Sequence, residues 1–144
     1  MDLFSDRLLA MADTGSFLFE GESNNHMLRA IQELRGGFSH KMIRRSTLKT
    51  QAGFGDDFTF YAQPGRHNKK DKKVRPMKFT TPTKDLFSLL CPPATVSQMS
   101  ASEVAKIQLF KDVLEKMLTL DPEKRPSPDE ILVHQFFQVD AAKK

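Results

Sequence analysis

Two helix-start signals of the same kind flank one turn near the C-terminus, and they constrain the fold more than any other sequence feature. Ser100 is followed three residues later by Glu103, and Ser127 by Glu130. In such a capping box the serine and the acidic side chain each satisfy a backbone N–H group that the first helical turn leaves unpaired. Apolar residues recur at helical spacing after each signal, so the sequence predicts two helices on either side of the turn that holds Arg125.

The apolar stripes of these helices predict which face of each is buried. The two stripes consist of Val104, Ile107, Phe110, Val113, Leu114 and Met117, and of Ile131, Leu132 and Phe136. Three further helices are expected at residues 3–15, at 24–34 after a Ser23 cap, and at 85–90, where the sequence is DLFSLL. They stop at Gly15, at Gly36-Gly37 and before two prolines. We therefore expect a mostly helical chain.

The middle of the chain breaks this pattern. From Phe38 to about Thr83 the helical periodicity fails, which indicates a long irregular insertion with one short strand around residues 58–62. Residues 66–78 carry seven cationic side chains: Arg66, Lys69, Lys70, Lys72, Lys73, Arg75 and Lys78. Because these charges repel one another and cannot contribute a core, we expect this basic segment to be a mobile, solvated loop.

Three interpretations of the basic segment are open. A charge run is most often a solvated segment, but the KKDKK cluster also fits a nuclear-localisation signal, and its charge fits an electrostatic contact with RNA. Phe58, Phe60 and Tyr61, just before it, have side chains that can stack on bases. Because aromatic residues are usually buried, we favour a role for them in covering a small core of the insertion itself.

Composition excludes several kinds of site. The formal net charge of +4 comes largely from the basic segment and so describes a local patch. Cys91 is the single cysteine, which excludes an internal disulfide and a cysteine-cluster zinc site, and the four histidines are too scattered to predict a metal site. No apolar run approaches a membrane span, and Asp2 and Asp6 stand where a signal peptide has basic residues. We expect a soluble, intracellular chain.

Several stretches of the sequence resemble one enzyme family. LDPEKRPSPDEILVHQFF, residues 120–137, resembles the end of the C-terminal lobe of eukaryotic protein kinases, with Arg125 at the arginine kept between the last two large helices. More specific are GSFLFEGESNNHMLRAIQELRG, KMIRRSTLKTQ and TPTKDLFSLL. In this order they are similar to the spliceosomal pre-mRNA-processing kinases, a family of the CMGC group of serine/threonine kinases. The resemblance covers nearly the whole chain.

The resemblance implies a mostly α, truncated kinase C-lobe without an N-lobe. Residues 1–144 would form the partial C-lobe and residues 38–100 the CMGC insertion. Asp2 would brace the catalytic loop, and Arg125 would form a buried ion pair with the glutamate of an Ala-Pro-Glu motif, which these residues lack. Because a buried charge without its partner is costly, we expect Arg125 to turn outward, to contact Asp121 or Glu123, or to loosen its surroundings.

The sequence lacks the machinery of phosphoryl transfer. A kinase needs a Gly-rich loop, a strand-borne lysine, a catalytic-loop aspartate and asparagine, and an Asp-Phe-Gly motif, and none is present. We therefore nominate no catalytic, cofactor-binding or metal-binding residue, although a complete parent kinase would use ATP and Mg²⁺. We expect a fragment of a splicing-linked serine/threonine kinase, inactive alone, which is either truncated from a longer protein or a genuine short product.

The alternative is a non-catalytic interaction module that docks splicing proteins or RNA through the insertion and the exposed helices. Protein partners, splicing factors among them, are the favoured partners and RNA the less favoured one, with no membrane partner. The resemblance and the basic segment together imply a nuclear location, and a cytoplasmic location is the alternative.

Overall fold

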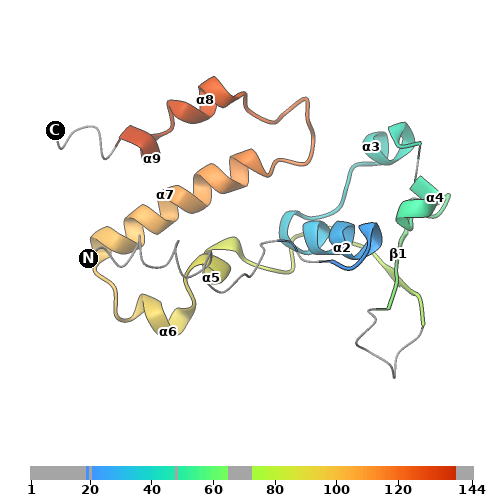
Figure 1. Cartoon of the computed structure of the whole chain (residues 1–144), viewed down its shortest axis with the longest axis horizontal. Coiled ribbons are helices and arrows are strands. Elements are labelled where there is room, and N and C mark those ends of the chain that lie inside the picture. The colour runs from blue at the N-terminus through green and yellow to red at the C-terminus, as the bar shows by residue number, and fades with distance from the viewer. Residues whose placement is uncertain (1–18, 20, 48, 65–72, 139–144) are drawn as a thin grey trace. The chain divides into compact units, whose positions relative to one another are not determined.

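The computed structural model describes residue 19 and residues 21–47, 49–64 and 73–138. The chain divides into two compact units, which we call the N-terminal unit (described residues 19–84) and the C-terminal unit (described residues 85–138). Helices dominate both units, and the N-terminal unit also has a small sheet (Figure 1). The prediction of a mostly helical chain is therefore confirmed.

The N-terminal unit begins with helix α2, Asn24–Arg35. The Ser23 hydroxyl accepts a hydrogen bond from the His26 N–H at 3.2 Å, so the predicted cap is confirmed. The helix ends at Gly36, whose φ of 82° suits a residue without a side chain. The elements that follow are α3 (His40–Arg45), α4 (Lys49–Ala52), β1 (Phe60–Ala62) and β2 (Arg75–Met77).

The core of this unit lies between its helices and its sheet. β1 and β2 pair antiparallel, with Phe60 opposite Met77, and Phe60 also bridges to Phe54. The buried core residues are Ile43, Phe54, Phe60 and Ala62. The partly buried residues packed against them are Leu28, Phe38, Ala52, Phe58, Met77 and Phe79. Aromatic rings therefore supply much of the apolar surface that this unit buries.

The C-terminal unit is built around helix α7, Ala101–Met117. Both predicted capping boxes are confirmed, since Ser100 caps α7 and Ser127 caps α8. The other elements of this unit are α5 (Leu86–Leu90), α6 (Pro93–Val96), α8 (Pro128–Leu132) and α9 (Gln135–Gln138). Helices α5, α8 and α9 contact α7. Of the predicted stripe of α7, Ile107 and Val113 are buried.

The middle of the chain has more regular structure than predicted. The described residues between 38 and 83 contain two short helices and two strands. The strand predicted around residues 58–62 pairs with β2, which lies inside the basic segment. The prediction that the whole basic segment is a solvated loop is therefore wrong for Arg75–Met77, which form β2, and Met77 packs against the core. Its pairing with buried Phe60 brings it against the core, while Arg75 and Lys78 stay exposed.

Two helix boundaries also differ from the prediction. The last helix divides into α8 and α9, because the ring of His134 accepts the Phe136 N–H and caps a new turn, and Leu132 is left exposed. The prolines expected only to stop α5 also start α6, since proline is well tolerated in a first turn. The helix predicted at residues 3–15 lies outside the described residues. Within those residues, no helix has the length and apolarity needed to cross a membrane.

Candidate partner-binding site

One buried asparagine ties together the elements of the N-terminal unit. The side chain of Asn25 is only 2% exposed. Its Nδ2 donates to the carbonyls of Ala52 and Tyr61 at 3.0 and 2.9 Å, and its Oδ1 accepts the Gln63 N–H at 2.8 Å. Gly53 makes room for this network, because a Cβ there would collide with Asn25 Nδ2. The network holds α2, the end of α4 and β1 in one arrangement.

A second connection closes the unit at the other end of α2. The Glu33 carboxylate forms ion pairs with Arg29 at 2.8 Å and with Lys84 at 2.7 Å. Its backbone carbonyl accepts the N–H groups of Thr83 and Lys84. Burial opposes ionisation of Glu33, but the hydrogen bonds and charges of Lys84 and Arg29 prevail and hold the pKa of this carboxyl below its ordinary value.

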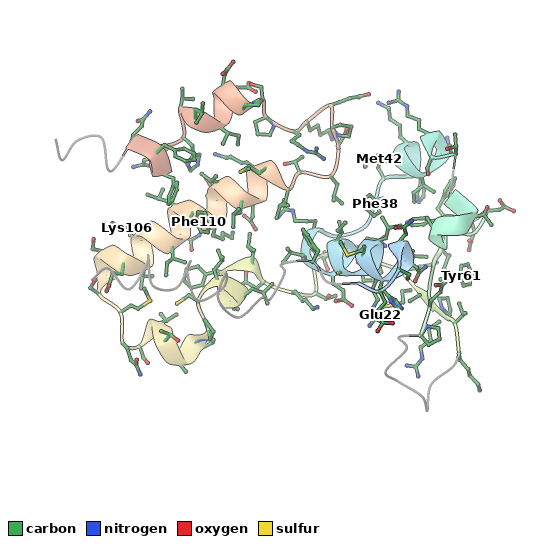
Figure 2. The ribbon with its side chains drawn as sticks, viewed as in Figure 1. Glu22, Phe38, Met42, Tyr61, Lys106 and Phe110 are labelled. Carbon is green, nitrogen blue, oxygen red and sulfur yellow. The ribbon has the colours of Figure 1, made fainter. Side chains whose placement is uncertain are left out.

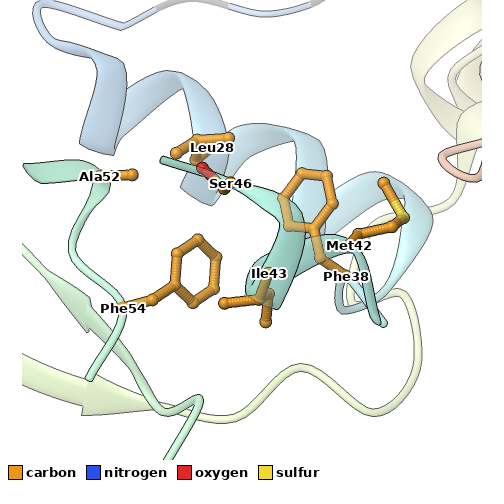
Figure 3. A pocket seen from close by; sticks show the side chains of 7 residues that line it. All are labelled: Leu28, Phe38, Met42, Ile43, Ser46, Ala52 and Phe54. Atoms are coloured by element: carbon orange, nitrogen blue, oxygen red, sulfur yellow. The ribbon is translucent and has the colours of Figure 1, made fainter. Parts of the chain in front are cut away.

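A pocket of about 190 Å³ lies between α2, α3 and α4. It is lined by Leu28, Phe38, Met42, Ile43, Ser46, Ala52 and Phe54, and Figure 3 shows these side chains around it. Ile43 and Phe54 are buried, four of the others are half-buried, and Ser46 is exposed. No lining residue is charged. Because the Asn25 network holds the backbone at Ala52, the pocket belongs to the folded unit and does not need a ligand to form.

Helix α3 separates this pocket from a cationic surface. The Ser39 hydroxyl caps the helix by accepting the Met42 N–H at 3.3 Å. Met42 and Ile43 face the pocket, and Phe38 and Met42 are labelled at this place in Figure 2. The remaining positions of α3 are exposed and cationic or titratable: His40, Lys41, Arg44 and Arg45. We call Lys41, Arg44 and Arg45 the basic face of α3.

A strained turn supports the basic face of α3. Phe58 has a φ of 63°, which is uncommon for a residue with a side chain. Its ring stacks on His40 with centroids 4.4 Å apart and lies 5.3 Å from the Arg44 guanidinium. Asp57 stabilises the turn, since Oδ1 accepts the Thr59 N–H and Oδ2 accepts the Thr59 hydroxyl. These two bonds also lower the pKa of Asp57.

A polar contact joins distant residues of the C-terminal unit. His134 Nδ1 accepts the Phe136 N–H at 3.2 Å, so Nε2 carries the proton and donates to Asp112 Oδ2 at 2.7 Å. Lys116 Nζ lies 3.2 Å from the same oxygen. The hydrogen bonds from His134 and Lys116 hold the pKa of Asp112 below its ordinary value. The contact joins α7 to the turn between α8 and α9, a structural role.

The residues singled out in the sequence do not form one site in the described structure. Those that lie outside the described residues are Asp2, Arg66, Lys69, Lys70 and Lys72. Lys73, Arg75 and Lys78 are exposed in and beside β2. Within the described ranges, no group of three or more His, Cys, Asp and Glu side chains is placed to hold a metal ion.

Arg125 lies in the C-terminal unit, in the turn between α7 and α8. Its side chain is exposed, and Nε donates to the Thr119 carbonyl at 2.9 Å. Its backbone N–H donates to the Asp121 carbonyl at 3.0 Å. The side chain therefore turns outward, which was one of the expected alternatives, and the guanidinium satisfies a carbonyl just beyond the end of α7.

Sequence reasoning missed Asn25, the pocket and the basic face of α3. Asn25 stands in the first turn of a helix, where a polar residue is ordinarily solvated, and its partners are far away in the sequence. Helix α3 spans only six residues, too few to show a period. The signal available was Ser39 before His40–Arg45, a cap followed by an apolar pair, Met42 and Ile43, that cationic residues flank.

Comparison with known proteins identifies the relatives of the chain. No protein-family model matches it. It is 38% identical over 130 residues to serine/threonine-protein kinase prpf4B of Dictyostelium discoideum, and 40% identical over 124 residues to serine/threonine-protein kinase prp4 of Schizosaccharomyces pombe. Over 124 residues it is 30% identical to the dual specificity protein kinase lkh1 of S. pombe.

These alignments cover most of the chain but little of each relative. They include 90%, 86% and 86% of the chain, which spans 16%, 25% and 16% of the relatives' own lengths. Three observations agree on a relation to protein kinases: the order of the kinase-like stretches, the two capped helices and these identities. Over most of its length, the chain is therefore a homologue of one segment of the PRP4-type serine/threonine kinases.

Proposed function

We propose that this chain is part of the C-lobe of a serine/threonine kinase linked to pre-mRNA splicing, and that it does not transfer phosphate by itself. The observation that carries the proposal is a contrast within the sequence. Proteins named as kinases align with 86–90% of the chain, yet its 144 residues contain none of the motifs that bind nucleotide and Mg²⁺ or that position a substrate hydroxyl. The segment supplies scaffold, and the complete kinase supplies the chemistry.

Nucleotide binding tests this proposal directly. Isothermal titration of the full chain with Mg-ATP should give no saturable heat, whereas the kinase domain of S. pombe prp4, titrated as the control, should bind. A second assay measures transfer of radioactive phosphate to a protein substrate. Transfer that follows the concentration of this chain through successive columns would overturn the proposal.

Arg125 offers a test of the kinase C-lobe assignment itself. In the present chain its side chain is exposed, so Arg125→Ala should leave the free energy of unfolding nearly unchanged. In a chimera that carries residues 19–138 within the prp4 kinase domain, an Ala-Pro-Glu glutamate would be available as a buried partner. There the same substitution should cost about 3–5 kcal/mol. An equally small effect in both proteins would contradict the assignment.

A non-catalytic interaction role is the second candidate, favoured by the apolar pocket beside the basic face of α3.

We also propose nuclear localisation directed by the basic segment. Replacement of Lys69, Lys70, Lys72 and Lys73 by Ala should shift a fluorescent fusion of the chain towards the cytoplasm. If the segment instead contacts RNA, the same variant should lose an RNA affinity that falls steeply with salt.

A further inference from the structure

The pocket between α2, α3 and α4 is suited to one apolar group. Its volume of about 190 Å³ exceeds that of an engineered cavity of about 150 Å³, lined by Leu, Ile and Phe, that binds benzene. The lining here is similar in kind, with Ile43 and Phe54 buried and with Leu28, Phe38 and Met42 half-buried. A phenylalanine or leucine side chain is therefore a fitting occupant (Figure 3).

The charges beside the pocket indicate what should flank that side chain. Lys41, Arg44 and Arg45 are exposed on the helix that also supplies Met42 and Ile43 to the pocket, and α3 contains no acidic residue. Carboxylates of a ligand that enters the pocket would meet a cationic surface, and such complementarity favours acidic partners and disfavours basic ones.

We propose that the pocket and the basic face of α3 together form a docking site for a short acidic peptide segment with one aromatic or leucine anchor. The anchor fills the pocket, and flanking Asp or Glu side chains contact the basic face. Ser46, exposed among the lining residues, marks the rim. This docking site depends on the proposed interaction role and not on the proposed kinase assignment. A chain that fails to bind the peptide would therefore still be expected to show no Mg-ATP binding.

A fluorescein-labelled peptide Glu-Glu-Asp-Phe-Glu-Glu, titrated with the full chain, tests the anchor and the charges separately. Replacing its Phe by Ala should weaken binding about tenfold or more, because the apolar anchor is lost. Replacing its acidic residues by Lys should abolish binding. Equal affinity for the Phe and Ala peptides would overturn the proposal, as would capture of labelled single-stranded RNA at this site in competition with the peptide.

Variants of the chain locate the site. Ala52→Leu should fill the pocket and weaken peptide binding about tenfold. Ser46→Asp, at an exposed position, places a negative charge at the rim and should weaken binding about two- to fivefold without filling the pocket. Arg44→Ala should weaken binding by a similar factor, and Lys124→Ala, an exposed cation of the C-terminal unit, is the matched control and should not. Circular dichroism establishes that each variant is folded, and unchanged affinity in both folded Ala52→Leu and Ser46→Asp would overturn the proposal.

Discussion

The two units of this protein are stabilised in different ways. In the N-terminal unit the decisive hydrogen bonds join residues far apart in the sequence, such as Asn25 with Gln63 and Glu33 with Thr83. Among the described residues of the C-terminal unit, capping boxes and ion pairs four residues apart recur, such as Lys111 with Glu115, beside the longer-range contact of His134 with Asp112. A network that needs every distant partner at once should fail more completely than helices that each carry their own start signal. The stability of the N-terminal unit should therefore depend more on a single residue than that of the C-terminal unit.

The largest effect should come from Asn25→Ala. The substitution removes three part-buried hydrogen bonds and leaves the backbone groups of Ala52, Tyr61 and Gln63 without this partner. Because each hydrogen bond contributes about 0.5–1.5 kcal/mol, we expect a loss of up to about 4 kcal/mol in the free energy of unfolding, measured by urea denaturation. Asn24→Ala, at the exposed neighbouring position, is the control. Similar losses in the two variants would show that the network does not hold the unit together.

A core truncation in the other unit makes the comparison sharper. Ile107 is 3% exposed in α7, and Ile107→Ala should lower the free energy of unfolding by about 2–3 kcal/mol through the cavity it leaves. Hydrogen exchange should show the lost protection within residues 85–138 and little change in the N-terminal unit. Gln108→Ala, at an exposed position of the same helix, serves for comparison. Loss of protection throughout the chain would mean that the units unfold as one.

Removing a helix cap should have a smaller effect. The Ser100 hydroxyl accepts the Glu103 N–H at 3.3 Å, and the Glu103 carboxylate accepts the Ser100 N–H at 2.8 Å. Ser100→Ala should cost about 1 kcal/mol, observed as a lower urea midpoint. Ser102 is exposed and lies two residues further along the chain, and Ser102→Ala should be neutral or slightly stabilising. A loss of stability as large as that of Ile107→Ala would mean that Ser100 contributes to tertiary packing as well as to the local helix cap.

The smallest effect concerns pH. The pKa of Glu33 is lower in the folded protein than in the unfolded chain. The contribution of its carboxylate to folding stability is therefore fully present above the ordinary glutamate pKa and is lost as the pH falls through the lower folded-state pKa. Glu33→Gln should therefore lower stability at neutral pH by about 1 kcal/mol or less and make no difference in acid. Urea midpoints across the acid range measure this. A parallel loss of stability at every pH in Glu33→Gln would exclude ionisation as the cause.

The sequence predicted the local features well. Caps at Ser23, Ser100 and Ser127 are confirmed because a helix start is decided by residues within one turn of one another. The kinase relationship was also visible in the sequence, since several short stretches that follow one another in a characteristic order indicate it. The insertion was the weakest prediction, because β1 is three residues long and its partner β2 lies within a segment dominated by charge.

By itself, the sequence determined where the main helices begin, which family the chain resembles, and that the motifs of phosphoryl transfer are missing from these residues. Only the tertiary structure decided that Asn25 is buried and that Met77 joins a core. It also decided that Met42 and Ile43 face a pocket beside a basic surface. The reason is physical: capping depends on neighbours within one helical turn, whereas burial depends on which distant backbone groups and rings arrive at the same place.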